Sequence, residues 1–366
     1  MTSPWSFKQY GECGHWISEL FPEVATCADE LCVLRSMQTD VPAHPQAFAQ
    51  LHTGSLQFKR PSMGAWTLYG LGSENDNLPG FITISPPINL GGPTNYGSSF
   101  LPASFQGTPI GAPRRAPASA KVSNIRNPQQ STASQRMQLD FIQSLNGRDL
   151  ELDPNNSAIE GAIESYELAF RMQDELPKVM DLSQETAATQ SAYGIENPAT
   201  MNFGQGCLLA RRCIEAGVRF VEVTSPAWDH HVNLTTDLPT NCMSVDKPIA
   251  ALLQDLKARD LLKDTLVIWG GEFGRTPYAQ NGNGRDHNHK KYTMWMAGGG
   301  VKGGLAYGQT DEFGYEAIEN PIHIHDFHAT VLHLMGLDHE RLTYRYAGRD
   351  MRLTDVKGHI VIDIVL

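Results

Sequence analysis

The sequence predicts one α/β domain with a mostly parallel central sheet and helices on both faces. Two observations carry this prediction. Short apolar strands alternate with amphipathic helices in the second half of the 366-residue chain, and polar segments able to bind metal lie at the ends of these strands. Such alternation is typical of parallel sheets that are covered by helices. With 41% hydrophobic and 19% charged residues, the composition is that of a globular protein.

The elements of the first half are short. Apolar residues at 17, 20, 21 and 24 recur at helical spacing, so we expect helical stretches before residue 31. A strand is expected over 31–35, and a helix over 46–56 begins just after Pro45, where proline is tolerated. A further strand is expected over 81–85.

Residues 102–136 are rich in Pro, Ala, Ser and Gln and hold few large apolar side chains. Such a composition indicates either a flexible linker or a long surface segment. We interpret it as a surface excursion within a single domain that spans residues 1–366.

Periodic apolar positions and stopping glycines predict the helices of the second half. These helices are expected over 159–170, 204–216, 245–256 and 326–336. Runs of apolar and β-branched residues predict the strands between them. These strands are expected over 218–223, 265–269 and 292–297.

Charge and hydropathy exclude some classes of partner. The formal net charge is -11, which argues against a nucleic-acid-binding surface because such a surface needs clustered Lys and Arg. Anionic small substrates remain compatible, since a bound cation reverses the local field. No apolar run approaches the roughly 18 residues of a membrane span, and the first residues lack the pattern of an export signal.

The first candidate site follows the strand over 218–223. Asp229 and His231 stand two residues apart in an extended loop, so that both side chains point the same way toward one cation. An exposed polar turn is the alternative interpretation. Sites in α/β folds form at the carboxyl ends of strands, which is where this loop begins.

The second candidate follows the strand over 265–269. Glu272 and Arg275 lie in a glycine-rich turn that lets a ligand approach closely. Glu272 is a candidate metal ligand, and Arg275 a candidate clamp for an oxyanion. An Arg–Glu pair that closes the loop is the alternative.

The third candidate, just before the strand at 292, is richest in ligand types. Asp286, His287 and His289 occur within four residues, and mixed His and carboxylate ligands suit zinc or a similar divalent ion.

A further group of histidines at 323, 325 and 328 surrounds a helix start, and we interpret it as capping and packing. The loop before the helix at 46 offers His44 at a helix N-terminus, a suitable place for a nucleophile that faces an anion.

Several dense segments resemble the family of domain-of-unknown-function 1501 proteins, which are often described as sulfatase-like and are common in planctomycetes and related bacteria. These segments are residues 60–64, 70–75, 261–277, 284–287, 295–304, 326–338 and 348–355. The resemblance covers nearly the whole chain. Members of this family usually begin with an export leader and a first strand, and the present chain begins after both. The resemblance implies an exported or periplasmic location, with a cytoplasmic one as the alternative.

That family in turn is similar to the alkaline phosphatase–sulfatase superfamily. The similarity implies a metal site at Asp229, His231 and His287, to which Glu272 is added in the place of an aspartate ligand. The metal would be zinc, with calcium as the alternative. Phe273 stands where the superfamily has a second ligand, a histidine.

The similarity also bears on catalysis. Thr53 resembles the threonine that ends the nucleophile helix, and counting back along this helix places His44 at the nucleophile position. His44 would then be a nucleophile, a ligand of a second metal, or a replacement for a lost nucleophile. Glu222, Asp286, His289 and Thr53 would support the ligands or the substrate.

The function implied by this resemblance is metal-dependent hydrolysis of sulfate or phosphate monoesters. The substrate would be an anionic small molecule or a polysaccharide ester, with Arg275 holding its equatorial oxygens. A catalytically inactive metal-binding or scaffold protein of the same fold is the alternative. A phosphomutase or transferase is a further alternative, in which His44 would carry the transferred group.

Overall fold

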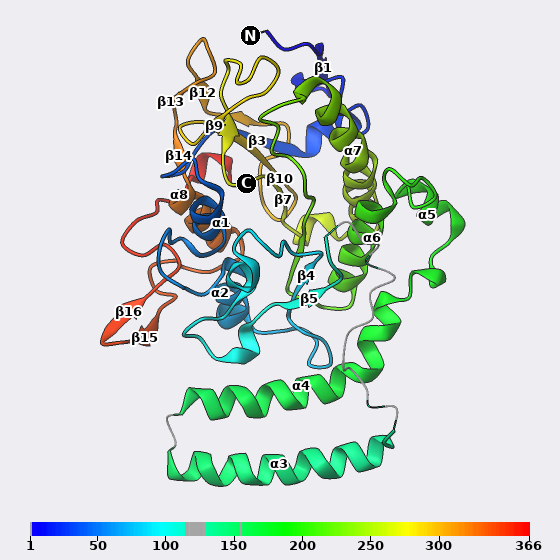
Figure 1. The fold of residues 1–366 in the computed structure, drawn as a ribbon, viewed down its shortest axis with the longest axis vertical. Coiled ribbons are helices and arrows are strands. Elements are labelled where there is room, and N and C mark those ends of the chain that lie inside the picture. The colour runs from blue at the N-terminus through cyan, green and yellow to red at the C-terminus, as the bar shows by residue number, and fades with distance from the viewer. Residues whose placement is uncertain (1, 114–116, 118–126, 128, 154–155) are drawn as a thin grey trace.

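The computed structural model describes residues 2–113, 117, 127, 129–153 and 156–366 (Figure 1). The α/β class predicted from the sequence is confirmed. The larger sheet has the strand order β11–β3–β10–β7, and β14 also pairs with β3. Its strands are β3 (Leu31–Gln38), β7 (Val267–Trp269), β10 (Tyr292–Ala297), β11 (Ala306–Tyr307) and β14 (Ile322–His323).

Strand directions are mostly parallel in the two main sheets. In the larger sheet β3 is parallel to β11 and β14, whereas β10 is antiparallel to both β3 and β7. Because β10 is reversed relative to both neighbours, β3 and β7 point the same way. The second sheet is wholly parallel, in the order β5–β4–β6. Its strands are β4 (Phe81–Ile84), β5 (Thr108–Ile110) and β6 (Phe220–Val223).

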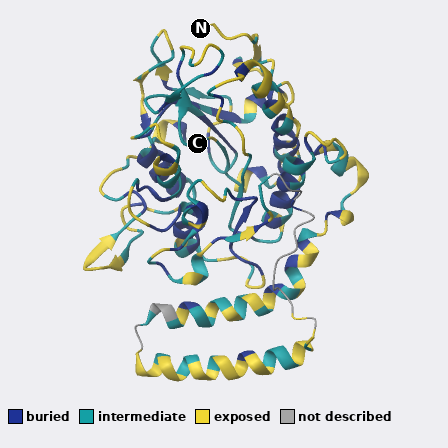
Figure 2. Cartoon of the chain, in the orientation of Figure 1, coloured by how far each residue is buried: buried dark blue, intermediate teal, exposed yellow. Residues whose placement is uncertain are grey.

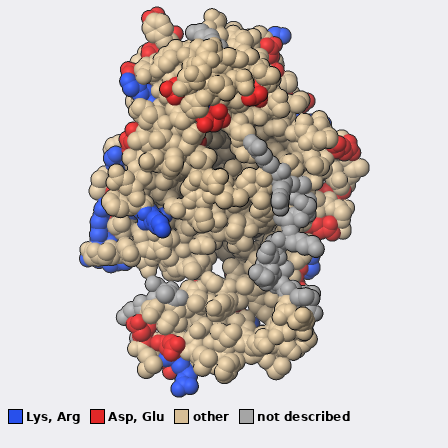
Figure 3. All heavy atoms as spheres, in the orientation of Figure 1, with Lys and Arg blue, Asp and Glu red and all other residues tan. Residues whose placement is uncertain are grey.

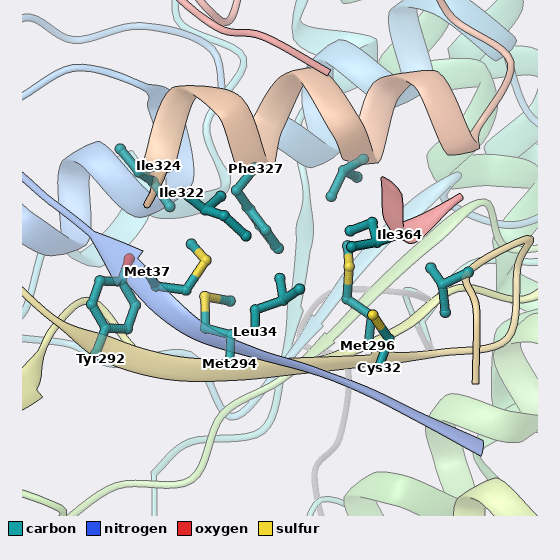
Figure 4. Packing of buried hydrophobic residues seen from close by; sticks show 12 residues of the cluster. Cys32, Leu34, Met37, Tyr292, Met294, Met296, Ile322, Ile324, Phe327 and Ile364 are labelled. Carbon is teal, nitrogen blue, oxygen red and sulfur yellow. The ribbon is translucent and has the colours of Figure 1, made fainter. Parts of the chain in front are cut away.

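Side chains alternate along the strands of the larger sheet, so both of its faces carry apolar residues. Helices cover both faces. On one face Leu34 and Met296 belong to one buried cluster with Phe327 of α8 (Ile324–Leu334), as Figure 4 shows. On the other face Trp295 packs in one cluster with Leu253 of α7 (Leu234–Ala258). The buried residues in Figure 2 accordingly concentrate on the strands and on the inner sides of these helices.

The remaining helices lie around these sheets. They are α1 (His44–Thr53), α2 (Met63–Leu71), α3 (Thr132–Leu152), α4 (Ser157–Met180), α5 (Ala187–Ala192) and α6 (Met201–Glu215). Helices α3 and α4 run side by side at the lower end of the molecule in Figure 1. Among the described residues, no helix combines the length and the apolar character that a membrane crossing requires.

Small two-stranded pairs complete the structure. They are β1–β2 (Phe7–Tyr10 and His15–Ser18), β8–β9 (Gly274–Arg275 and His287–Asn288), β12–β13 (Gln309–Thr310 and Ala317–Glu319) and β15–β16 (Tyr344–Tyr346 and Arg349–Met351). The six cysteines are free, and five of them are buried, as is common for cysteines that pack in a core.

Two local expectations were wrong. The segment before β3 forms the β1–β2 hairpin and a short 3-10 helix, because long-range bonds hold it. The Asp29 carboxylate accepts from the backbone N–H of Cys13, and the Asp246 carboxylate of α7 accepts from that of Val24. Helix α7 also begins at Leu234, eleven residues before the expected start, and passes through Pro239 and Pro248.

The structure describes only part of the surface excursion predicted for residues 102–136. Residues 108–110 form β5, and α3 begins at Thr132. Residues 114–116, 118–126 and 128 lie outside the described residues, so the single-domain interpretation stays a prediction.

Candidate metal centre

The loops that follow three strands converge on one point. The loop after β3 leads to His44, the first residue of α1, and the loop after β6 carries Asp229 and His231. Glu272 lies just beyond β7, and the β8–β9 pair places Arg275 directly opposite His287. Since β3 and β7 share one direction, their carboxyl ends face the same edge of the sheet, as the general rule for such folds predicts.

One carboxylate oxygen lies at the centre of this group. Asp229 Oδ1 lies 3.0 Å from His231 Nε2, 3.1 Å from His287 Nε2 and 3.2 Å from His44 Nε2. The Nε2 atoms of His231 and His287 are themselves only 2.9 Å apart. Three imidazole nitrogens therefore surround a single anionic oxygen.

The opposite ring nitrogen of each histidine contacts an oxygen acceptor. His44 Nδ1 lies 2.5 Å from Glu272 Oε1, and His287 Nδ1 lies 2.7 Å from the carbonyl oxygen of Pro42. A carboxylate or carbonyl oxygen can only accept, so Nδ1 carries the proton in both rings. In a neutral imidazole Nε2 then keeps its lone pair, directed toward Asp229.

His231 follows the same arrangement. Its Nδ1 lies 2.5 Å from Gln280 Oε1 and 3.9 Å from Asp286 Oδ1. The Asp286 carboxylate also accepts from the backbone N–H of His287 at 2.8 Å. Both ligand-bearing segments are thus tied to oxygen acceptors behind the rings, which fixes the tautomer and the direction of each Nε2.

These donors fit a divalent cation. His44 Nε2 is buried and faces Asp229 without a hydrogen bond, so its lone pair has no proton donor. The Nε2 atoms of His231 and His287 are 2.9 Å apart, so a shared proton or a cation is needed to offset the repulsion between their lone pairs. Ligand atoms of His44, Asp229 and His287 lie within 4.8 Å of one another, as do those of His231, Asp286 and His287. Nitrogen donors with one carboxylate are typical of zinc.

Arg275 keeps Asp229 ionised. Its Nη2 donates to Asp229 Oδ1 at 2.5 Å and to the carbonyl of Trp228 at 3.3 Å, while Nη1 donates to the carbonyl of Arg285 at 3.2 Å. Burial alone would favour the neutral acid, but the hydrogen bond and the positive charge of Arg275 outweigh it and hold the pKa of Asp229 well below its usual range. The hydrogen bond to Glu272 raises the pKa of His44, against the effect of burial.

The structure brings together seven of the ten predicted site residues and leaves three with other partners. The seven are His44, Asp229, His231, Glu272, Arg275, Asp286 and His287. Glu222 lies 3.4 Å from His52 Nε2, and Thr53 donates its hydroxyl to the carbonyl of Ala49 inside α1. The backbone carbonyl of His289 accepts from the backbone N–H of Thr39.

Sequence reasoning missed the three contacts that brace the histidines. Gln280 and the Pro42 carbonyl carry no family signal, and Phe273 packs its ring 4.8 Å from that of His44 and 4.4 Å from that of His287. Gln280 and Gly284 exchange two backbone hydrogen bonds of 2.8 Å, and this glycine precedes the segment that carries His287.

Solved structures with a partly similar fold were found. One is the crystal structure of Ps i-CgsB in complex with k-i-k-neocarrahexaose, with 12% identity and a TM-score of 0.40, over 87% of this chain and 67% of that chain. Another is the PsFucS1 sulfatase from Pseudoalteromonas sp., with 14% identity and a TM-score of 0.39, over 87% of this chain and 62% of that chain. At these scores neither likeness bears on activity.

Among curated proteins no match was found. The sequence profile that does match covers the chain from end to end, in agreement with the motif resemblance. Residues 1–365 match the family described as protein of unknown function (DUF1501), and the chain belongs to that family.

Proposed function

We propose that this protein is a metal-dependent hydrolase of sulfate or phosphate monoesters. One observation carries the proposal, namely the convergence of three imidazole Nε2 atoms on Asp229 Oδ1 while each Nδ1 is held by an oxygen acceptor. The resemblance of the same segments to the alkaline phosphatase–sulfatase superfamily supports this reaction class. The ligands would be His44, His231, His287 and Asp229.

The donor set favours zinc over calcium, because calcium takes oxygen ligands whereas three histidine nitrogens lie within 3.2 Å of Asp229 Oδ1. A divalent cation held by these residues supplies Lewis acidity toward an ester oxygen. The residues of the chain do the positioning. Glu272 holds His44 through Nδ1, and Arg275 keeps Asp229 anionic and fixed in place.

Two roles differ from the sequence-based expectation within this proposal. Both terminal nitrogens of Arg275 are engaged by protein oxygens, so we assign it to positioning Asp229 rather than to clamping the substrate. The Nε2 lone pair of His44 faces the same oxygen as those of the other two histidines, so we assign it as a ligand rather than as the nucleophile. Glu272 then supports His44 instead of binding metal itself.

Metal content tests the proposal first. Plasma mass spectrometry on the purified protein should find about one zinc per chain. His287→Ala should lose the metal, whereas the control His359→Ala, at an exposed position, should keep it. Absence of stoichiometric metal, or its retention in His287→Ala, would refute the site.

Hydrolysis of aryl sulfate and aryl phosphate esters is the second measurement. Turnover should disappear with a chelator, return with zinc and be absent in His287→Ala. A metal-loaded protein that hydrolyses neither ester would instead support the inactive metal-binding alternative, which the full engagement of Arg275 by protein oxygens favours.

A further inference from the structure

A cleft of about 290 Å³ lies at the carboxyl edge of the second sheet, and none of the site residues described above lines it. Strands β4 and β6 are parallel, with Ile84 opposite Val223, so Ser85 and Thr224 follow them side by side at that edge. The carboxyl ends of parallel strands are where α/β folds bind ligands. Helices α6 and α7 also line the cleft. Their residues in it are Asn202, Phe203, Gly206, Asn241 and Ser244.

Three polar side chains at this cleft have no partner in the described part of the chain. Ser85 is only 7% exposed, and its hydroxyl forms no hydrogen bond with a described residue. The hydroxyl of Thr224 and the side-chain amide of Asn202 are likewise without one among the described residues. A nearly buried polar group usually has a hydrogen-bond partner, so these groups call for a ligand or water. Hydroxyl and amide groups both donate and accept, as the hydroxyls of a ligand do.

The described lining of the cleft carries no charge. Among the described residues that line it there is no Asp, Glu, Lys, Arg or His, although the whole chain has a net charge of -11. On the face seen in Figure 3, charged side chains lie mainly toward the edges, and the middle is mostly uncharged. Ile84, Phe203 and Pro226 add apolar surface to the cleft. A neutral ligand with an apolar face and hydroxyl groups therefore fits it, whereas a charged group would lose its hydration without gaining an ion pair.

Strained backbone joins the cleft to the metal centre. Ser85 and Ala227, which both line the cleft, have φ angles of 55° and 77°, in the left-handed region. Such angles are uncommon for residues other than glycine and often mark functional sites. The Asn241 side-chain amide donates to the Ala227 carbonyl and holds it in place. Asp229 follows Ala227 by two residues, so their Cα atoms lie within about 7 Å. One molecule can therefore occupy the cleft and reach the metal centre.

We propose that this cleft binds one neutral sugar residue, which is the organic part of an ester whose charged group lies at the metal centre. The second half of this statement rests on the proposed function, whereas binding of the sugar requires no metal. A pyranose ring has hydroxyls around its edge, which match Ser85 and Asn202, and C–H groups on its faces, which match the Phe203 ring. The volume is just below the roughly 300–1,000 Å³ typical of ligand sites, which suits one ring rather than a longer chain.

Saturation-transfer difference NMR on the chelated full chain tests the cleft without reference to activity. The probes are the methyl glycosides of glucose, galactose and mannose, and at least one should bind saturably, with a dissociation constant of roughly 1 mM. Benzyl alcohol, whose ring carries no set of hydroxyls, should bind about tenfold more weakly or not at all. Ser85→Ala and Asn202→Ala should each weaken binding of the glycoside by about fivefold or more, whereas the matched control Asn146→Ala, on α3, should not.

Zinc content and glycoside binding should respond to different variants. His287→Ala should lose zinc and keep the glycoside, whereas Asn202→Ala should keep zinc and bind the glycoside more weakly. Absence of saturable binding for all three glycosides would overturn the proposal, as would wild-type affinity in Ser85→Ala and Asn202→Ala with a native circular dichroism spectrum. Loss of the glycoside in His287→Ala would place the sugar at the metal centre and overturn the assignment of the cleft. A chain that binds the glycoside and hydrolyses no ester refutes only the proposed function, and hydrolysis without glycoside binding refutes only the cleft.

Discussion

Gly284 lies against the backbone of His231 so closely that a Cβ at position 284 would stand 1.8 Å from the His231 carbonyl oxygen. This contact brings the 280–284 turn beside the loop that carries Asp229 and His231. The backbone N–H of Arg285 also donates to the carbonyl of His230 at 3.0 Å. The position of Gln280, and with it the orientation of His231, depends on this close approach.

Gly284→Ala should therefore lower both stability and metal affinity. The overlap with a backbone oxygen cannot be relieved by a side-chain rotation, so we expect a loss of about 1–3 kcal/mol in urea unfolding of the chelated protein. Gly271→Ala is the control, because no atom lies within 4 Å of its Cβ position. Equal stability of both variants would contradict this account.

The acceptors behind the histidines should tune metal affinity. Glu272→Gln and Gln280→Ala should each weaken zinc binding by ~10–100-fold, as expected when a residue that orients a ligand is changed. Competition with a chromogenic chelator measures this, and circular dichroism checks the fold. Glu316→Gln, which alters an exposed partner of Lys290, is the control. Unchanged affinity in both variants would show that these acceptors do not orient the ligands.

Two buried histidines should make the fold sensitive to acid. Burial lowers the pKa of His325 to about 4 and that of His328 to about 3, and the neighbouring His323 adds repulsion in both cases. Lys357 adds to it at His325, and His52 at His328. Below about pH 6.5 these two imidazoles bind protons in the unfolded chain but stay neutral in the native chain. The stability therefore falls as the pH falls from about 6.5 toward these values.

Each of these groups should contribute a slope of roughly 1.4 kcal/mol per pH unit. Urea unfolding between pH 7 and pH 5 measures it. In His328→Gln, which keeps a hydrogen-bond donor for the Leu51 carbonyl, the slope should fall by about one proton's share. A slope equal to that of the wild type would exclude His328 as the source.

Removal of the buried charge of Arg211 should lower the stability more than removal of an exposed charge. It is 2% exposed and forms ion pairs with Glu185 at 2.7 Å, Asp255 at 3.0 Å and Glu215. Arg211→Leu leaves these carboxylates without their shared cation, so we expect a loss of about 3–5 kcal/mol. Arg259→Leu removes a more exposed partner of Glu215 and Asp255 and should cost about 1 kcal/mol or less. Similar losses would contradict the role of burial.

The sequence predicts those parts of the fold whose signal is local. Helices α1, α6 and α8 and strands β3, β4 and β6 lie where apolar periodicity and stopping glycines place them. The first thirty residues were misjudged because their conformation depends on Asp246, which is distant in the sequence. Helix α3 was not predicted, although Met137, Phe141 and Leu145 recur at helical spacing, because its first turn lies in the segment 102–136 that was interpreted as a surface excursion.

The candidate site divides in the same way. Residues of metal-binding type at strand ends were predictable, since parallel strands bring their carboxyl ends together. The assignment of each Nε2 was not, because it depends on what stands behind the ring. A glutamine side chain and a main-chain carbonyl perform that task at His231 and His287, and neither has a distinctive sequence signature.

The carbonyl of Pro42 has a consequence for how this centre can evolve. A single codon change can remove Glu272 or Gln280 and so retune His44 or His231, whereas every residue at position 42 presents the same carbonyl oxygen. Single substitutions can therefore change the orientation of His44 and that of His231 independently. The acceptor of His287 Nδ1 moves only when the main-chain path of its loop changes, so side-chain substitution at position 42 leaves the orientation of His287 in place.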